Sequence, residues 1–214
     1  MTNVLVLCDS PWHPAEVIEL GFAPLEGDDF HFVFVKAAKD ILTPERIAGF
    51  PLIICAKGDS VTEANNHPWF EDGVTEVAAA EFEEYIKAGG GFIALHAGSI
   101  GRKGTPYGDF VGCTFTGHPP RCGIDVKVTG KHPIVAGIED FSIRDEHYQT
   151  TLDIEAEELF RTVSPSGGDQ IAGYIREIGN GRMAVLTPGH CVDVFYNESF
   201  KKILVNTMNW CLKK

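Results

Sequence analysis

Positive charge is scarce in this sequence. Its 18 Lys and Arg residues stand against 30 Asp and Glu residues, which leaves a net charge of −12 at pH 7. Because a surface of this sign repels polyanions, neither nucleic acid nor an anionic membrane is expected as a partner. Long apolar runs are also missing, and none reaches the roughly 20 residues that a membrane-spanning helix needs. No basic segment precedes the short apolar run at residues 4–8, so we expect no secretion signal and a cytoplasmic protein.

Paired cysteines are missing as well. The six cysteines include no C-x-x-C pair and are scattered along the chain: Cys8, Cys55, Cys113, Cys122, Cys191 and Cys211. Without that spacing a zinc–thiolate site is not expected, and a chain of 214 residues can build a core without disulfides. We therefore expect six free thiols, most of them buried. Only Cys113, between His96 and His118, is expected near a functional site.

The first half of the chain alternates short apolar runs with helical spacing. Apolar runs of strand length occupy residues 4–7, 31–35, 51–56 and 92–95. Helical patterns lie between them, at residues 15–20, 43–46 and 77–86. This alternation predicts an α/β fold, a flavodoxin-like, doubly wound, mostly parallel sheet with helices on both faces. The length suits one domain over residues 1–214, and the sequence leaves a homo-oligomer open.

The second half of the chain is less regular. Residues 99–132 are rich in Gly, Pro, Thr and His, and we expect a long functional loop over most of this stretch. Strand patterns recur at residues 124–128, 143–148, 172–177 and 181–187, and a helical pattern closes the chain at residues 200–211. The last two strand patterns predict a hairpin with Asn180-Gly181 as its turn.

One buried strand pattern ends in a turn of small residues that carries a single functional side chain. The apolar run 92–95 is followed by His96, and then by Ala97 and Gly98. In an open parallel sheet, ligands bind outside the carboxyl ends of the strands. We therefore expect His96 to open into a polar cleft at this edge, with Gly98 letting a substrate approach the backbone.

Three more histidines have comparable positions. His13 and His190 each follow a predicted strand, and His118 lies in the long loop after His96. We expect these imidazoles to converge on one crevice. Together with carboxylates they form a ligand set for Zn, Mn, Fe or Ni, and equally a set for proton transfer near neutral pH.

Carboxylates are available beside these histidines. Asp59 follows a predicted strand, and Asp145 and Glu146 lie within another. Side chains alternate along a strand, so Asp145 and His147 are expected to face one way and Glu146 and Tyr148 the other. Only one of these pairs can then face the site.

These positions suggest a role for each candidate. Catalysis is expected from His96, Glu146 and His190. Contacts with the substrate are expected from His13, Gly98, Asp145 and Tyr148. A divalent metal, Zn or similar, is expected on His96, His118 and His190. No nucleotide cofactor is expected.

Five motifs, in this order along the chain, resemble those of the ThuA-like proteins, a family named for trehalose utilisation. They are residues 91–98 (GFIALHAG), 112–119 (GCTFTGHP), 132–138 (HPIVAGI), 145–148 (DEHY) and 181–190 (GRMAVLTPGH). ThuA-like proteins are similar in fold to class I glutamine amidotransferases, so the resemblance implies the same flavodoxin-like architecture. It also implies a small carbohydrate or glycoside-derived substrate, such as an oxidised keto-sugar.

The same comparison argues against one activity. A glutamine amidotransferase carries its nucleophile at the centre of G-x-C-x-G, on the turn after such a strand. Here the corresponding residues 94–98 read ALHAG, with His96 at the nucleophile position. Without a thiolate to attack the amide, glutaminase activity is not expected.

Three functions stay open on the sequence. The first is an enzyme that acts on a sugar or keto-sugar with a divalent metal that polarises a carbonyl or activates water. The second is a metal-free enzyme that uses the same side chains for proton transfer. The third is a non-catalytic binding or accessory domain derived from the amidotransferase fold.

Overall fold

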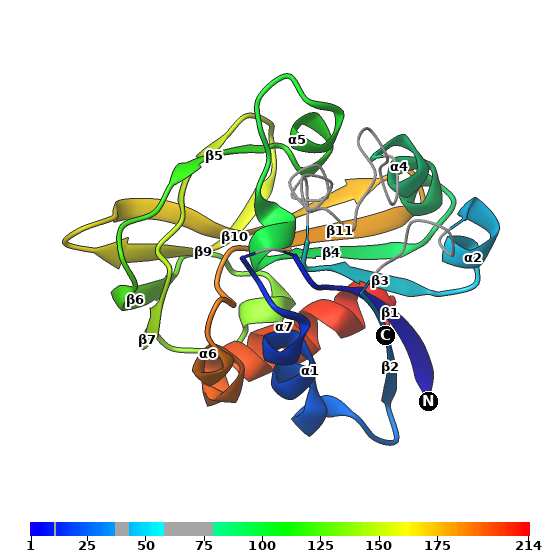
Figure 1. Ribbon diagram of the computed structural model, residues 1–214, viewed down its shortest axis with the longest axis horizontal. Helices are drawn as coiled ribbons and strands as arrows, with labels where there is room; N and C mark the ends of the chain where they lie inside the picture. Colours follow the sequence, from blue (N-terminus) through cyan, green and yellow to red (C-terminus); the bar gives the residue numbers. More distant parts are fainter. Residues whose placement is uncertain (11, 37–42, 58–78) are drawn as a thin grey trace.

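The structure is a computed structural model that describes residues 1–10, 12–36, 43–57 and 79–214. A nine-stranded sheet runs through the molecule in the order β2-β1-β3-β4-β11-β10-β9-β6-β7 (Figure 1). Its first five strands are parallel: β2 (Phe30–Val35), β1 (Thr2–Leu7), β3 (Leu52–Cys55), β4 (Gly91–Leu95) and β11 (Gly181–Leu186). Numbered along the chain, this is the flavodoxin order 2-1-3-4-5, so the predicted fold class is confirmed.

The other half of the sheet is antiparallel. It consists of β10 (Gly168–Ile178), β9 (Glu157–Ser164), β6 (Cys122–Val128) and β7 (Phe141–Asp145). The predicted hairpin joins β10 to β11, but Ile178 pairs with Gly181, so its two turn residues are Gly179 and Asn180. Gly179 has a φ of 59°, a conformation that glycine adopts without a steric penalty. The turn expected at Asn180-Gly181 was therefore wrong by one residue.

Helices cover both faces of the sheet (Figure 1). One face is covered by α1 (Ala15–Phe22), α6 (Val192–Tyr196) and α7 (Glu198–Cys211). The other is covered by α2 (Pro44–Ala48), α4 (Ala79–Lys87) and α5 (Pro106–Val111). Short 3-10 helices are η1 (Ala23–Leu25), η3 (His96–Ser99) and η4 (Pro133–Val135). No helix in the described part of the chain is long and apolar enough to cross a membrane.

The alternation of side chains in β4 divides the interior into two cores. Ile93 and Leu95 belong to the core under α7, whereas Phe92 and Ala94 belong to the core under α4. The closing helix α7 was predicted from its apolar spacing, and it buries Phe200, Ile203, Leu204, Thr207, Met208 and Cys211. Asn197 caps α7, because its side-chain oxygen accepts hydrogen bonds from the backbone N–H groups of the first turn.

The loop expected over residues 99–132 is more ordered than its composition suggests. It contains α5 and β5 (Cys113–Gly117), and β5 pairs with β8 (Gln149–Leu152) in a separate two-stranded sheet. Thr105 caps α5, since its hydroxyl oxygen lies 3.1 Å from the backbone nitrogen of Gly108 and accepts its hydrogen bond. Elements of five or six residues are too short to give a clear period in the sequence.

The strand expected over residues 143–148 ends at Asp145. Asp145 still pairs with Cys122 in the large sheet, and from Gln149 onward the chain pairs with β5. The three residues between them cross from one sheet to the other and belong to neither. The strict alternation expected for these side chains therefore does not apply beyond Asp145.

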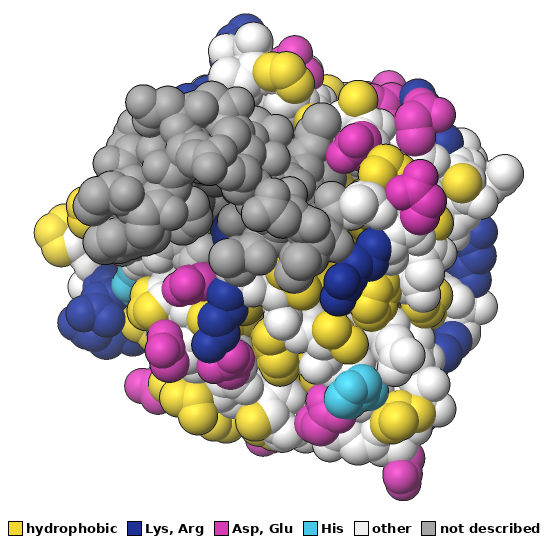
Figure 2. Space-filling view, turned by 45° about the vertical axis from the view of Figure 1, so that its right-hand side comes forward, with side chains coloured by type: hydrophobic (Ala, Val, Ile, Leu, Met, Phe, Trp, Pro, Cys, Tyr) yellow, Lys and Arg dark blue, Asp and Glu magenta, His cyan; other side chains and the backbone are white. Residues whose placement is uncertain are grey.

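Charges of both signs are mixed on the face of the molecule that Figure 2 views. Lys and Arg side chains lie there beside Asp and Glu side chains, with hydrophobic atoms between them. Among the exposed ion pairs of the described residues, Lys87 Nζ lies 2.9 Å from carboxylate oxygens of Glu83 and Glu84. Exposed pairs contribute little to stability because water screens them.

Candidate functional site

Four side chains meet at the edge of the large sheet where its parallel strands end. They are His13, His96, Glu146 and His190, and one ligand atom from each lies within 4.8 Å of the others. The three histidines come from the loop after β1, the turn after β4 and the loop after β11. Because these strands are parallel, their carboxyl ends share one edge, as expected for a ligand site in such a sheet. We call these four residues the histidine cluster.

His96 is held in an unusual backbone conformation at the centre of the cluster. Its φ is 47°, in the left-handed region that side chains other than glycine rarely adopt. Its Nδ1 lies 2.8 Å from the backbone carbonyl oxygen of Thr187. A carbonyl only accepts, so Nδ1 carries the proton and Nε2 presents a lone pair to the cluster. The residue is 2% exposed and its neighbours are polar, as expected, whereas the cleft beside it stays a prediction.

Glu146 supplies the negative charge of the cluster. Its Oε2 lies 3.2 Å from His190 Nδ1, 3.6 Å from His96 Nε2 and 3.7 Å from His118 Nε2. Partial burial raises the pKa of this carboxyl, but the imidazoles of His190 and His96 more than offset this, so its pKa lies well below the usual range. Glu146 is therefore ionised at neutral pH.

His13 is a neutral member of the cluster. Its ring centroid lies 4.9 Å from that of His96 and 5.4 Å from that of His190. Burial, together with the neighbouring rings of His96 and His190, lowers the pKa of His13 to about 3. A neutral imidazole is the form that binds metal ions.

Tyr148 contacts both His96 and His13 through its hydroxyl group. Its hydroxyl lies 2.9 Å from His96 Nε2 and 3.3 Å from His13 Nε2, and its ring stacks on that of His96 with centroids 4.4 Å apart. Burial and the nearby charges of Glu146 and Asp145 raise the pKa of Tyr148 well above its usual value. Its hydroxyl therefore stays protonated and can donate.

The donor set fits a divalent cation. His190 Nδ1 is buried and has no hydrogen-bond partner among the described residues, and its contact with Glu146 is one of proximity and charge. An unsatisfied buried polar atom of this kind costs free energy unless something binds it. Neutral imidazoles with one carboxylate are the ligands that Zn, Mn, Fe and Ni accept.

His118, expected as a metal ligand, lies at the rim of the cluster. Its side chain is 35% exposed and reaches Glu146 only at 3.7 Å, while its Nδ1 lies 2.9 Å from the carbonyl oxygen of Pro119. His13, expected as a substrate contact, lies within the cluster at the position that was expected for His118. The sequence held a signal for this, because His13 follows a parallel strand and His118 does not.

Gly98, expected to contact the substrate, packs against the sheet, and its contact with a substrate stays a prediction. A Cβ at Gly98 would lie 1.7 Å from the carbonyl oxygen of Cys55, and the carbonyl of Gly98 accepts a hydrogen bond of 2.7 Å from the Tyr107 hydroxyl. Absence of a side chain at Gly98 thus lets the turn after β4 close onto the end of β3.

Asp145, also expected to contact the substrate, is fully buried and binds backbone instead. Its carboxylate accepts hydrogen bonds from the N–H groups of Gly189, His190 and Cys191. Asp145 and Glu146 therefore both serve the site, although they were expected to face opposite ways.

Two further expectations can be placed. All six cysteines lie in the described residues and are free thiols, as predicted. Cys113 is buried, with its Sγ 3.2 Å from the carbonyl oxygen of Ser99, whereas Cys191, which was not singled out, directly follows His190. Asp59 lies outside the described residues.

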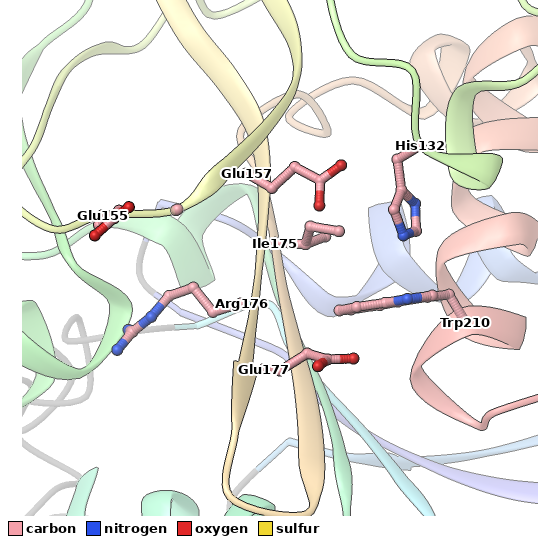
Figure 3. Close-up of a pocket in the computed structure, with 8 residues that line it drawn as sticks. His132, Glu155, Glu157, Ile175, Arg176, Glu177 and Trp210 are labelled. Carbon is pink, nitrogen blue, oxygen red and sulfur yellow. The ribbon is translucent and has the colours of Figure 1, made fainter.

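A separate pocket of about 600 Å³ lies at the opposite edge of the sheet (Figure 3). It is lined by His132, Glu155, Ala156, Glu157, Ile175, Arg176, Glu177 and Trp210. It forms where β9 begins at Glu157 while β10 continues beside the start of β11. The Arg176 side chain points away from Trp210 and donates to the carbonyl of Phe110. Nothing in the sequence predicts this pocket, because its lining comes from segments far apart in the chain.

Comparisons with known structures agree with this architecture. A ThuA-like protein from Bacteroides uniformis superposes with a TM-score of 0.72 at 22% identity, over 98% of this chain and 91% of that one. A protein from Salmonella typhimurium described as cytoplasmic has a TM-score of 0.68 at 12% identity, over 99% of both chains. A β-galactosidase from Rahnella sp. R3 has a TM-score of 0.63 at 13% identity, over 98% of this chain but 31% of its own. At these identities the likeness shows the fold.

Sequence comparisons identify the family. No curated protein matches this sequence. The family model for ThuA, described as trehalose utilisation, matches residues 12–211, which include every residue of the histidine cluster. The chain therefore belongs to the ThuA family.

Proposed function

We propose that this chain is a metal-dependent enzyme of carbohydrate metabolism that acts on a small sugar derivative, such as a keto-sugar. The observation that carries the proposal is the histidine cluster, in which three imidazoles and one carboxylate converge within 4.8 Å. Membership of the ThuA family supports a sugar derivative as the substrate. The presence of His96 at the position of a thiol nucleophile argues against glutaminase activity. A cytoplasmic location accords with the description of the Salmonella protein.

Each residue of the cluster has a role in this proposal. His13, His96, His190 and Glu146 would hold a divalent cation, which when bound polarises a carbonyl or lowers the pKa of water. Glu146 brings the negative charge that offsets the cation. Tyr148 keeps its proton, and its ring stacks on that of His96. His118, at the rim, has the exposure needed to meet a substrate or to transfer a proton to it.

Two other functions have observations in their favour. A metal-free enzyme would use the same residues for proton transfer, and the existing hydrogen bond between Tyr148 and His96 favours it. A binding or accessory domain is favoured by the β-galactosidase from Rahnella, in which the matching fold is only 31% of the chain.

Metal titration of the purified protein separates these functions. We expect the metal-stripped parent to bind about one Zn²⁺ or Mn²⁺ per chain, and the His96→Ala variant to lose this binding while keeping its circular dichroism and melting temperature. His31→Ala is the control, because His31 is exposed and pairs only with Glu26 among the described residues. Binding retained by His96→Ala would place the metal elsewhere, and no binding by the parent would leave the metal-free functions.

A panel of sugars and keto-sugars then separates an enzyme from a binding domain. An enzyme should convert a member of the panel, with the rate lost in His96→Ala. A binding domain should show only a thermal shift, since a ligand at a hundredfold excess over its Kd stabilises the folded state by about 2.7 kcal/mol.

A further inference from the structure

Asp145 is a fully buried carboxylate that accepts hydrogen bonds from three backbone N–H groups. Its Oδ2 lies 2.7 Å from the nitrogen of Gly189, and its Oδ1 lies 3.1 Å from the nitrogens of both His190 and Cys191. Three consecutive N–H groups thus point at one side chain. Charge-assisted hydrogen bonds of this kind are among the stronger ones in proteins, and they offset the cost of burying the charge.

These three N–H groups belong to the loop that carries His190. The loop leaves β11 through Gly189, whose φ is 141°, and enters α6 at Val192. Cys191, the residue before α6, makes no side-chain cap, and Asp145 binds the N–H groups of the loop up to Cys191 and not those of the first helical turn. The backbone of the loop is therefore anchored from 44 residues away in sequence.

Glu146, the residue after Asp145, contacts the side chain of His190. Asp145 binds the backbone N–H of His190, and Glu146 lies 3.2 Å from His190 Nδ1. Two adjacent residues therefore act on His190: Asp145 holds its backbone, and Glu146 lies beside its imidazole ring. A shift of the loop would move His190 Nδ1 away from the other ligand atoms of the cluster.

We propose that Asp145 is a positioning residue that holds His190 in the histidine cluster, an inference that rests on the proposed function. Its chemistry suits the task, because three N–H donors need a group that only accepts. Asparagine is nearly the same size but turns one of the two acceptors into a donor, which would face an N–H group of the loop. Asp145 acts on the cation only through His190.

A double-mutant cycle tests this, with Co²⁺ as the probe. We expect Asp145→Asn to weaken Co²⁺ binding about 10- to 100-fold, the usual loss when a residue that orients a metal ligand is changed. His190→Ala should also weaken binding. In the His190→Ala background, Asp145→Asn should have no further effect, because the residue that it positions is gone. Equal losses in both backgrounds, or no loss in the single variant, would overturn the proposal.

Thr207→Val is the matched control for a general loss of stability. Thr207 is fully buried in α7, and its hydroxyl donates to the carbonyl of Ile203, away from the cluster. It should lower the melting temperature without changing Co²⁺ affinity. An equal fall in affinity in Thr207→Val would mean that Asp145→Asn acts through stability alone, against the proposal.

Hydrogen exchange distinguishes failure of this inference from failure of the proposed function. If the parent does not bind Co²⁺, the metal-dependent function fails, but the amides of residues 189–191 still report on Asp145. We expect them to be protected in the metal-free parent and to exchange at least about tenfold faster in Asp145→Asn than in Thr207→Val. Unprotected amides in the parent would contradict the anchoring itself.

Discussion

At the scale of single residues, the Tyr148 hydroxyl hydrogen-bonds to the lone pair of His96 Nε2, which a cation would need. The Nδ1 of His96 carries a proton for the carbonyl of Thr187, so its Nε2 must accept, and the Tyr148 hydroxyl donates to it at 2.9 Å. One hydroxyl hydrogen serves only one ring, so His13 Nε2, at 3.3 Å, faces the oxygen of Tyr148 as a donor. Tyr148 and a bound cation therefore compete for His96.

Removing this hydroxyl should strengthen cation binding. We expect Tyr148→Phe to raise the affinity for Zn²⁺ about 2- to 10-fold. In the parent, Zn²⁺ must break the hydrogen bond from Tyr148 to His96, and a typical hydrogen bond contributes a net of about 0.5–1.5 kcal/mol. Competition with a chelating dye measures the change. Tyr174→Phe is the control, since its buried hydroxyl donates to the carbonyl of Val111, outside the cluster. A weaker site in Tyr148→Phe would instead identify Tyr148 as a support for the bound state.

At the scale of elements, the turn after β4 sets the position of His96. The 3-10 helix η3 begins at His96 and lies against the end of β3, where Gly98 meets the backbone of Cys55. The Tyr107 hydroxyl, from α5, bonds to the carbonyl of Gly98 on the same turn. Two elements, β3 and α5, therefore hold the sharp bend that aims His96 at the cluster.

A methyl group at Gly98 should open this bend. Its Cβ would lie 1.7 Å from the carbonyl oxygen of Cys55, and a backbone carbonyl in a central strand cannot turn aside as a side chain can. We expect Gly98→Ala to lower the free energy of unfolding by more than about 3 kcal/mol, at the upper end for overpacked sites, or to prevent folding. Urea unfolding measures it.

Gly123→Ala is the matched control for this substitution. Gly123 lies in β6, where a Cβ would meet no described atom within 4 Å. Its stability should match that of the parent within about 1 kcal/mol. Similar losses in both variants would contradict the view that the contact with Cys55 is responsible.

At the scale of the whole molecule, folding buries an imidazole in its neutral form outside the cluster. His147 is 1% exposed, with Nδ1 2.6 Å from Ser164 Oγ and Nε2 3.0 Å from Thr162 Oγ1. Burial lowers its pKa, and the hydrogen bond to the Thr162 backbone only partly opposes this. In the unfolded chain a histidine takes up its proton near pH 6.5.

The free energy of unfolding should therefore fall as pH decreases below about 6.5. In that range His147 binds a proton in the unfolded chain but not in the folded chain. The contribution of neutral His147 to stability is therefore fully present above the pKa of the unfolded state, and it is lost as the pH falls toward the lower pKa of the folded state. Urea unfolding of metal-free protein between pH 7 and 5 should show a smaller slope in His147→Gln than in the parent. Thr207→Val, which removes a buried hydroxyl and no titratable group, should keep the slope of the parent. Parallel curves for the parent and His147→Gln would contradict this account.

Local patterns in the sequence were enough to predict the fold class and most of the cluster. Periods of two and of 3.6 residues determine which faces of strands and helices are apolar, so the parallel half of the sheet and α7 could be inferred. Parallel strands bring their carboxyl ends to one edge, so His96 and His190 could be placed together. Short elements such as α5 and β5 could not be inferred, because they hold too few residues to show a period.

Packing, which no local pattern describes, selects which candidates meet and which support them. The residue types at the strand ends can be read from the sequence, but it does not show that His13 joins the cluster while His118 stays at its rim. It also could not show that the carboxylate of Asp145 binds a loop 44 residues away, or that Gly98 rests on the carbonyl of Cys55. The physical reason is that these contacts join segments brought together only by packing, whereas periodicity and capping act within one element.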